Sequence, residues 1–115
     1  MSNQPPVLRF RCFTHSLSII RALRPLLGSI KRHDASLVKQ VRSAASSVSL
    51  NLAESRGRRG KDALHFQRIA LGSAEETTAC LLVAEAWGYV DNDDIAECLA
   101  LLGHLQAMLG KLTRP

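Results

Sequence analysis

The chain has 115 residues, 46% apolar and 22% charged, which allows one domain with a modest core and excludes two. Aromatic residues make up only 4%, so the core must consist mainly of Leu, Ile, Val and Ala, as in helical bundles. Net charge is +5, and it is divided unevenly along the chain. Residues 1–74 carry thirteen Lys and Arg against three acids, whereas residues 75–115 carry two against seven. A basic half of this kind either contacts nucleic acid or docks on acidic protein surface.

Cysteine usage and hydropathy bear on the cellular setting. Cys12, Cys80 and Cys98 are odd in number and far apart, so they form neither a disulfide framework nor a CxxC metal clip. The longest stretch without Lys, Arg, Asp or Glu, residues 98–110, is too short to span a bilayer, and no secretory signal precedes it. We therefore expect a cytoplasmic protein with no membrane partner.

Four amphipathic segments follow an irregular N-terminal arm, predicted over residues 1–12. Apolar and small residues recur at three- and four-residue steps in each segment, which predicts helices at 13–31, 35–56, 61–87 and 92–113. Pro25 is expected to bend or loosen the first helix, Asp34 to cap the second, and Gly57 and Gly88 to end the second and third. Short turns favour antiparallel neighbours. The sequence thus predicts one all-α domain over residues 13–115, an antiparallel up-down-up-down four-helix bundle.

Two segments are apolar or small on more than one side. The second segment carries Leu37, Ala44 and Leu52 beside its main seam, and the third carries a further stripe at Leu64, Leu71, Thr78 and Leu82. A second apolar face favours self-association, the alternative being a wide stripe inside a tight monomer. We also expect Arg42 and Glu76, next to seam positions on adjacent helices, to form an ion pair.

Residue patterns for catalysis are missing from the sequence. Catalytic four-helix bundles hold two metals through Glu-x-x-His motifs, and no glutamate here is followed by histidine at that spacing. His15, His33, His65 and His104 share no spacing, and the serines lack a His/Asp pair that would activate them. The segment 57–62 departs from the P-loop pattern, because its glycines are too close and a helix precedes it. We expect no enzyme activity, no metal and no cofactor.

Cations gather around the turn between the second and third helices. A solvated turn is the simpler explanation, but the free backbone donors at the start of the third helix would also favour phosphate. No aromatic side chain alternates with these cations except Phe66, so stacking on a single strand is not indicated. The predicted nucleic-acid-binding residues are Arg56, Arg58, Arg59, Lys61 and Arg68, with Arg42 and Lys39 as lesser candidates.

Two segments resemble the signatures of a known family. Residues 40–48 read QVRSAASSV and residues 51–54 read NLAE, while Phe66, residues 69–76 (IALGSAEE), Ala84 and residues 88–89 (GY) match a second signature. This pattern is similar to that of the four-helix bundle proteins of bacterial 23S rRNA intervening sequences, which are related to the accessory variability proteins of diversity-generating retroelements. Ser49, where proline is common, and Ser55, where glycine is usual, depart from it.

The resemblance implies a homo-oligomer, a pentamer, whose basic surface engages RNA or DNA beside a reverse transcriptase or a ribosome-associated partner. It implies no catalytic residues. Taken with the residue analysis, it predicts a non-enzymatic oligomer that binds structured nucleic acid through phosphate contacts, with RNA as the leading candidate. The alternative is a protein–protein assembly module whose basic half docks on acidic surface, including its own residues 75–115.

Overall fold

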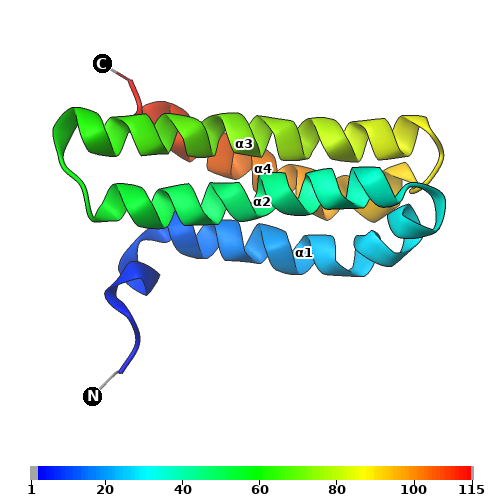
Figure 1. Ribbon diagram of the computed structural model, residues 1–115, viewed down its shortest axis with the longest axis horizontal. Helices are drawn as coiled ribbons and strands as arrows, with labels where there is room; N and C mark the ends of the chain where they lie inside the picture. Colours follow the sequence, from blue (N-terminus) through cyan, green and yellow to red (C-terminus); the bar gives the residue numbers. More distant parts are fainter. Residues whose placement is uncertain (1–2, 115) are drawn as a thin grey trace.

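Residues 3–114 of the computed structural model are described here, and they contain helices and no strand. The elements are a 3-10 helix at Pro6–Arg9, α1 at Arg11–His33, α2 at Ala35–Arg56, α3 at Gly60–Ala86 and α4 at Asn92–Leu112. Figure 1 shows successive helices running in opposite directions and joined by short turns. The predicted all-α four-helix bundle is confirmed, and the helix bounds lie within two residues of those expected.

The helix ends follow from local sequence. The Asp34 carboxylate accepts a hydrogen bond from the Leu37 backbone N–H at 2.9 Å, which caps α2 as predicted. Gly88 has φ +81°, and the Tyr89 N–H donates to the Ala84 carbonyl at 2.9 Å, so α3 ends in a Schellman motif. These caps keep the connections short, so neighbouring helices must reverse direction.

Pro25 does not end α1, which continues through it to His33. Proline removes the N–H that would bond the Arg21 carbonyl. Both Arg21 and Pro25 are exposed, so water can hydrate that carbonyl and the helix tolerates the missing bond.

The helices form a ring in which each packs against two neighbours. α2 and α3 share the most extensive interface, and α4 returns to pack against α1. The core between them is almost entirely aliphatic, and its largest fully buried members are Ile30, Val41, Leu52, Leu81, Ile95, Leu102, Leu105 and Leu109. The stripe predicted beside the seam of α2 also lies inside, because Leu37, Ala44 and Leu52 are all buried. On α2, therefore, the wide stripe serves the protomer's own core.

Each of the four helix–helix interfaces contains a polar contact as well as apolar packing. Such bonds fix the register between helices, which aliphatic packing alone specifies weakly. The pairs are Ser16 Oγ with Ser49 Oγ (2.7 Å), Ser47 Oγ with Ser73 Oγ (2.8 Å), Gln106 Nε2 donating to Thr78 Oγ1 (3.0 Å), and His15 Nε2 with the Leu101 carbonyl (3.1 Å). Ser49, one of the two departures from the family signature, thus ties α2 to α1.

α4 is long and apolar enough to cross a membrane by length and composition alone. Its residues Leu102, Leu105 and Leu109 are fully buried in the core of the bundle. The packing of the bundle therefore accounts for part of the apolar composition of α4.

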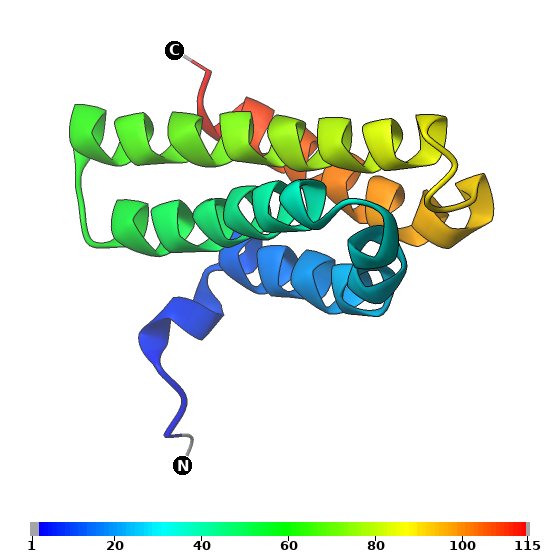
Figure 2. The same ribbon diagram turned by 45° about the vertical axis from the view of Figure 1, so that its right-hand side comes forward.

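The α2–α3 hairpin extends beyond the other two helices. Figures 1 and 2 both show its turn projecting past the start of α1 and the end of α4. We call this projecting end, residues 54–62, the hairpin tip. It is the part of the bundle least enclosed by neighbouring helices.

Leu52 and Leu50 offer a matched test of the core. Leu52 is fully buried, whereas Leu50, two residues away on α2, is 68% exposed. Leu52→Ala should lower the free energy of unfolding by about 2–5 kcal/mol through lost burial and the cavity left behind. Leu50→Ala should change it by less than about 0.5 kcal/mol. Urea denaturation followed by circular dichroism measures both, and equal effects would contradict the packing described.

Candidate nucleic-acid interface

The predicted basic residues fall into two groups along the α2–α3 hairpin. Arg56, Arg58, Arg59 and Lys61 lie at the hairpin tip, and all are exposed. Lys39 and Arg42 lie near the other end of α2, since fourteen residues separate Arg42 from Arg56, about 21 Å of helix. The structure therefore does not bring the seven predicted residues into one patch.

Arg58 differs from its neighbours at the hairpin tip. Its guanidinium lies 3.6 Å from the Glu54 carboxylate and 3.8 Å from that of Asp62, and its Cζ atom lies 5.0 Å from the centre of the Phe66 ring. These i,i+4 ion pairs are exposed and worth a few tenths of a kcal/mol each. Arg58 is thus partly neutralised and held in place, which makes it a weaker phosphate ligand than Arg56, Arg59 or Lys61.

The remaining cations of the tip stand without acidic partners. Within residues 3–114 every ion pair involves Arg58, so Arg56, Arg59 and Lys61 form none. Arg59 is the N-cap of α3, and Gly60 follows it with φ +55°. The open backbone donors of the first turn of α3 therefore lie beside these cations, where an anion is favoured.

Arg68 is exposed on α3, seven residues after Lys61 and so about 10 Å further along the helix. His65 lies between them, exposed, with its ring edge-on to Phe66 at 5.2 Å. Together they extend the basic surface of the tip along the outer side of α3.

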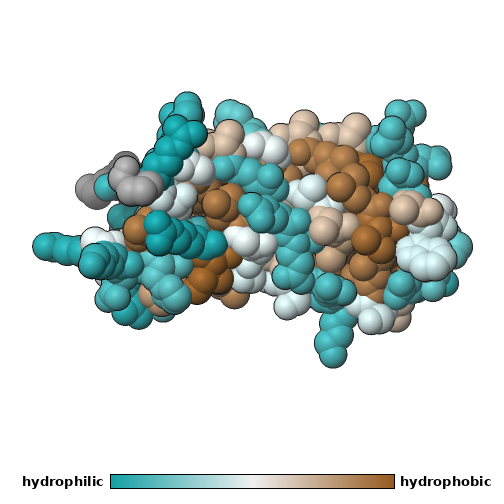
Figure 3. Space-filling model, turned by 90° about the horizontal axis from the view of Figure 1, so that it is seen from above, coloured by the Kyte–Doolittle hydropathy of each residue, from teal (hydrophilic) through white to brown (hydrophobic). Residues whose placement is uncertain are grey.

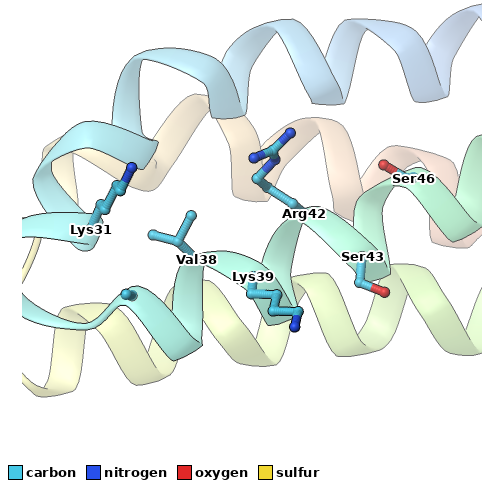
Figure 4. A pocket seen from close by; sticks show the side chains of 7 residues that line it. Lys31, Val38, Lys39, Arg42, Ser43 and Ser46 are labelled. Atoms are coloured by element: carbon cyan, nitrogen blue, oxygen red, sulfur yellow. The ribbon is translucent and has the colours of Figure 1, made fainter.

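A second basic surface lines a groove between α1 and α2. The groove holds about 380 Å³ and is lined by Lys31, Ala35, Val38, Lys39, Arg42, Ser43 and Ser46. A smaller adjoining hollow of about 250 Å³ shares Arg42 and Ser46 with it and adds Arg24. In Figure 4, Arg42 and Ser46 point toward α1, whose last turn supplies Lys31. We call the two adjoining hollows, with the residues that line them, the α1–α2 groove.

Sequence reasoning missed Arg24 and Lys31 as members of this surface. The available signal was composition, because residues 11–33 contain five Lys and Arg and no Asp or Glu. A helix with cations and no acids cannot neutralise itself through i,i+4 pairs. Arg24 and Lys31 accordingly form no ion pair in the described part of the chain, and neither does Arg42 on α2.

The predicted ion pair between Arg42 and Glu76 is not formed. Arg42 lies on the α1 side of α2, where it lines the groove with Arg24, and Figure 4 shows it pointing away from α3. Glu76 is on α3 and exposed. The prediction is wrong because helix periodicity places both residues beside the seam without saying which neighbouring helix each one faces.

The three cysteine thiols are buried and act as packing groups. Burial raises the pKa of all three thiols, and that of Cys98 reaches about 11, with the nearby Glu97 acting in the same direction. A thiol is nucleophilic only as the thiolate, so Cys98 is inert near neutral pH. Among residues 3–114, no three His, Cys, Asp or Glu side chains are placed to share a metal ion.

The geometry defines an antiparallel four-helix bundle with a projecting basic tip and a basic groove. A family model of 23S rRNA-intervening sequence proteins matches residues 14–111, and the chain belongs to that family. A solved structure of a protein of unknown function from the S23 ribosomal protein family of Bacteroides thetaiotaomicron has the same fold, with a TM-score of 0.80 at 18% sequence identity. The match covers 90% of this chain and 99% of that one. No curated protein matches the chain.

Cys98 gives a pH-dependent contribution to stability. Its thiol ionises near 11 in the folded chain, against an ordinary value of 9.0, so its contribution is fully present below pH 9 and is lost as pH rises toward 11. The free energy of unfolding in urea should fall over this range, by at most about 1.4 kcal/mol per pH unit from this group. Cys98→Ala should fall less steeply, and parallel curves for the two proteins would contradict the assignment.

Proposed function

We propose that this chain is a non-enzymatic, oligomeric bundle that binds structured nucleic acid through the α1–α2 groove and the hairpin tip, with RNA as the leading candidate. The observation that carries the proposal is the unneutralised charge of the groove. Four cations from two helices, Arg24, Lys31, Lys39 and Arg42, line two adjoining hollows and form no ion pair in residues 3–114. Clustered cations without acids bind polyanions and release their counterions.

The chemistry of the groove favours phosphate over bases. Its polar members besides the cations are the hydroxyls of Ser43 and Ser46, which contact phosphate and sugar oxygens in nucleic-acid complexes. Phosphate contacts fix a protein on a duplex without reading its sequence. The expected binding is therefore strongly salt-dependent and weakly sequence-dependent. Family membership supports the proposal, because the family takes its name from sequences within 23S rRNA genes.

The hairpin tip serves this function as a second contact. Arg56, Arg59 and Lys61 are exposed and unpaired, whereas Arg58 is held by Glu54 and Asp62. Within the tip we therefore assign phosphate binding to the three unpaired cations. The tip and the groove are about 21 Å apart along α2, so a folded RNA can contact both at once.

The proposed RNA binding is tested by titrating an RNA hairpin at several salt concentrations, with fluorescence anisotropy as the measurement. Lys31→Ala/Lys39→Ala/Arg42→Ala should reduce the slope of log affinity against log salt by about 2–3, since each lost phosphate contact reduces it by about 1. Arg59→Ala should weaken binding more than Arg58→Ala, its matched neighbour. Unchanged affinity in the triple variant, with helicity intact, would contradict the groove and favour docking on acidic protein surface.

Self-association is supported by the C-terminal half of α3. Leu82 is 48% exposed, Val83 44% and Trp87 70%, although each is large and apolar. Figure 3 shows an apolar area on this side of the molecule, toward the end at which α3 meets α4. Val83 and Trp87 lie one helical turn apart and share a face, and Leu82 lies to one side of them. Exposed large apolar side chains grouped in this way are typical of protein interfaces. We propose that α3 pairs with further copies of the chain, in the pentamer that the sequence resemblance implies.

The proposed assembly predicts a change of mass on adding charge to α3. Leu82→Asp/Val83→Asp should shift the molar mass measured by light scattering from the oligomer to the 12.6 kDa protomer, because charged groups cannot be buried unpaired. Leu50→Asp, also on an exposed leucine but on α2, should leave the mass unchanged. A wild-type chain that is monomeric at high concentration would contradict the proposal.

A further inference from the structure

A polar hollow lies between α1 and α4, on the other side of α1 from the groove. It holds about 290 Å³ and is lined by Arg11, Thr14, His15, Ser18 and Arg21 of α1 and by His104 and Met108 of α4. None of these residues belongs to the surface proposed above to bind RNA. The two histidines are 89 residues apart in the sequence, yet the fold places their rings side by side.

The two imidazoles form a defined pair. Their ring centroids are 4.8 Å apart with the planes tilted by 44°. His15 Nε2 lies 3.1 Å from the Leu101 carbonyl oxygen, which can only accept, so this nitrogen carries the proton and donates. That bond fixes the ring of His15 and leaves its Nδ1 for a further partner. His104 is exposed at the mouth of the hollow.

The charge of the hollow selects an anion. Arg11 and Arg21 line it and form no ion pair within residues 3–114. The acid that comes near is Glu97, which lines a neighbouring hollow together with Arg21. Two guanidinium groups and two imidazoles against one exposed carboxylate leave a net positive site, and both side-chain types bind phosphate oxygens well.

The spacing of the arginines indicates the size of the ligand. Arg11 and Arg21 are ten residues apart, about 15 Å along α1, and the histidine pair lies between them. Arginine side chains reaching inward from the two ends of the row can each contact a different phosphate group of one ligand. We propose that the α1–α4 hollow is a binding site for a ligand with two phosphate groups, either a free diphosphate or two successive phosphates of a nucleic-acid strand.

This site is independent of the α1–α2 groove. His15 and Lys31 are sixteen residues apart, which places them about 160° apart around α1. The two surfaces therefore face different directions, and a ligand in one does not occupy the other. The failure of RNA binding at the groove would leave the hollow untouched, and the reverse also holds.

The test is calorimetric titration of the full chain with pyrophosphate at low salt, with orthophosphate as the comparison. Arg11→Gln/Arg21→Gln removes two cations from α1 at the hollow, and the control Arg32→Gln/Arg114→Gln removes two exposed cations that belong to neither the hollow, the groove nor the hairpin tip. We expect pyrophosphate affinity to fall at least tenfold in the first variant and to stay within twofold in the second. Pyrophosphate should also shift the imidazole NMR signals of both His15 and His104, and His104→Gln should weaken its binding.

Four outcomes would overturn the proposal. Equal losses in the two double variants would mean that net charge alone attracts the ligand, and unmoved imidazole signals would place the ligand elsewhere. Orthophosphate binding as tight as pyrophosphate would contradict the two-phosphate site, and so would an absence of pyrophosphate binding together with unchanged RNA affinity in Arg11→Gln/Arg21→Gln. Loss of RNA affinity in that variant would identify a strand as the ligand, whereas a loss confined to pyrophosphate would identify a free diphosphate.

Discussion

The close approach of α2 and α3 is the constraint on which the rest of the structure depends. Ala44, Ala70 and Ala74 are buried at or beside this interface, and the hydroxyls of Ser47 and Ser73 meet at 2.8 Å. Larger side chains at these positions would separate the helices and break that bond. Because the two helices pack along so much of their length, they remain a stable hairpin even where α1 and α4 no longer flank them. The exposed cations of the hairpin tip are held in place by this packing.

Most of the fold could be predicted from periodicity and end signals. The steps of three and four residues place each helix, and Asp34 and Gly88 place the boundaries to within two residues, because capping is a local interaction. Periodicity could not show whether the residues beside each seam would be buried in the core or exposed on the surface. Leu37 and Leu52 beside the α2 seam proved to be core, and Leu82 on α3 proved to be surface. That distinction depends on where neighbouring helices lie, which no single segment encodes.

The basic surface was predictable in composition but only partly in position. The hairpin tip follows directly from the cluster at residues 56–61, but the pairing of Arg58 with Glu54 and Asp62 depends on the shape of the turn, because Arg58 lies in neither helix. The groove needed the lateral order of α1 and α2, because Arg24 and Arg42 are eighteen residues apart in the sequence and meet only after the turn. The pairing of His15 with His104 across α1 and α4 depends on the register of the first and last helices, which local patterns do not determine.

The projecting hairpin separates the part of the molecule that reaches outward from the part that holds the hydrophobic core. Core residues such as Leu102 and Leu105 lie in the four-helix section, whereas the hairpin tip is built from α2 and α3 alone. Adding seven residues to each helix of the hairpin would lengthen this arm by about 10 Å without inserting anything between the four packed helices. The reach of the molecule toward a distant partner can therefore diverge among its relatives while the folding unit stays the same.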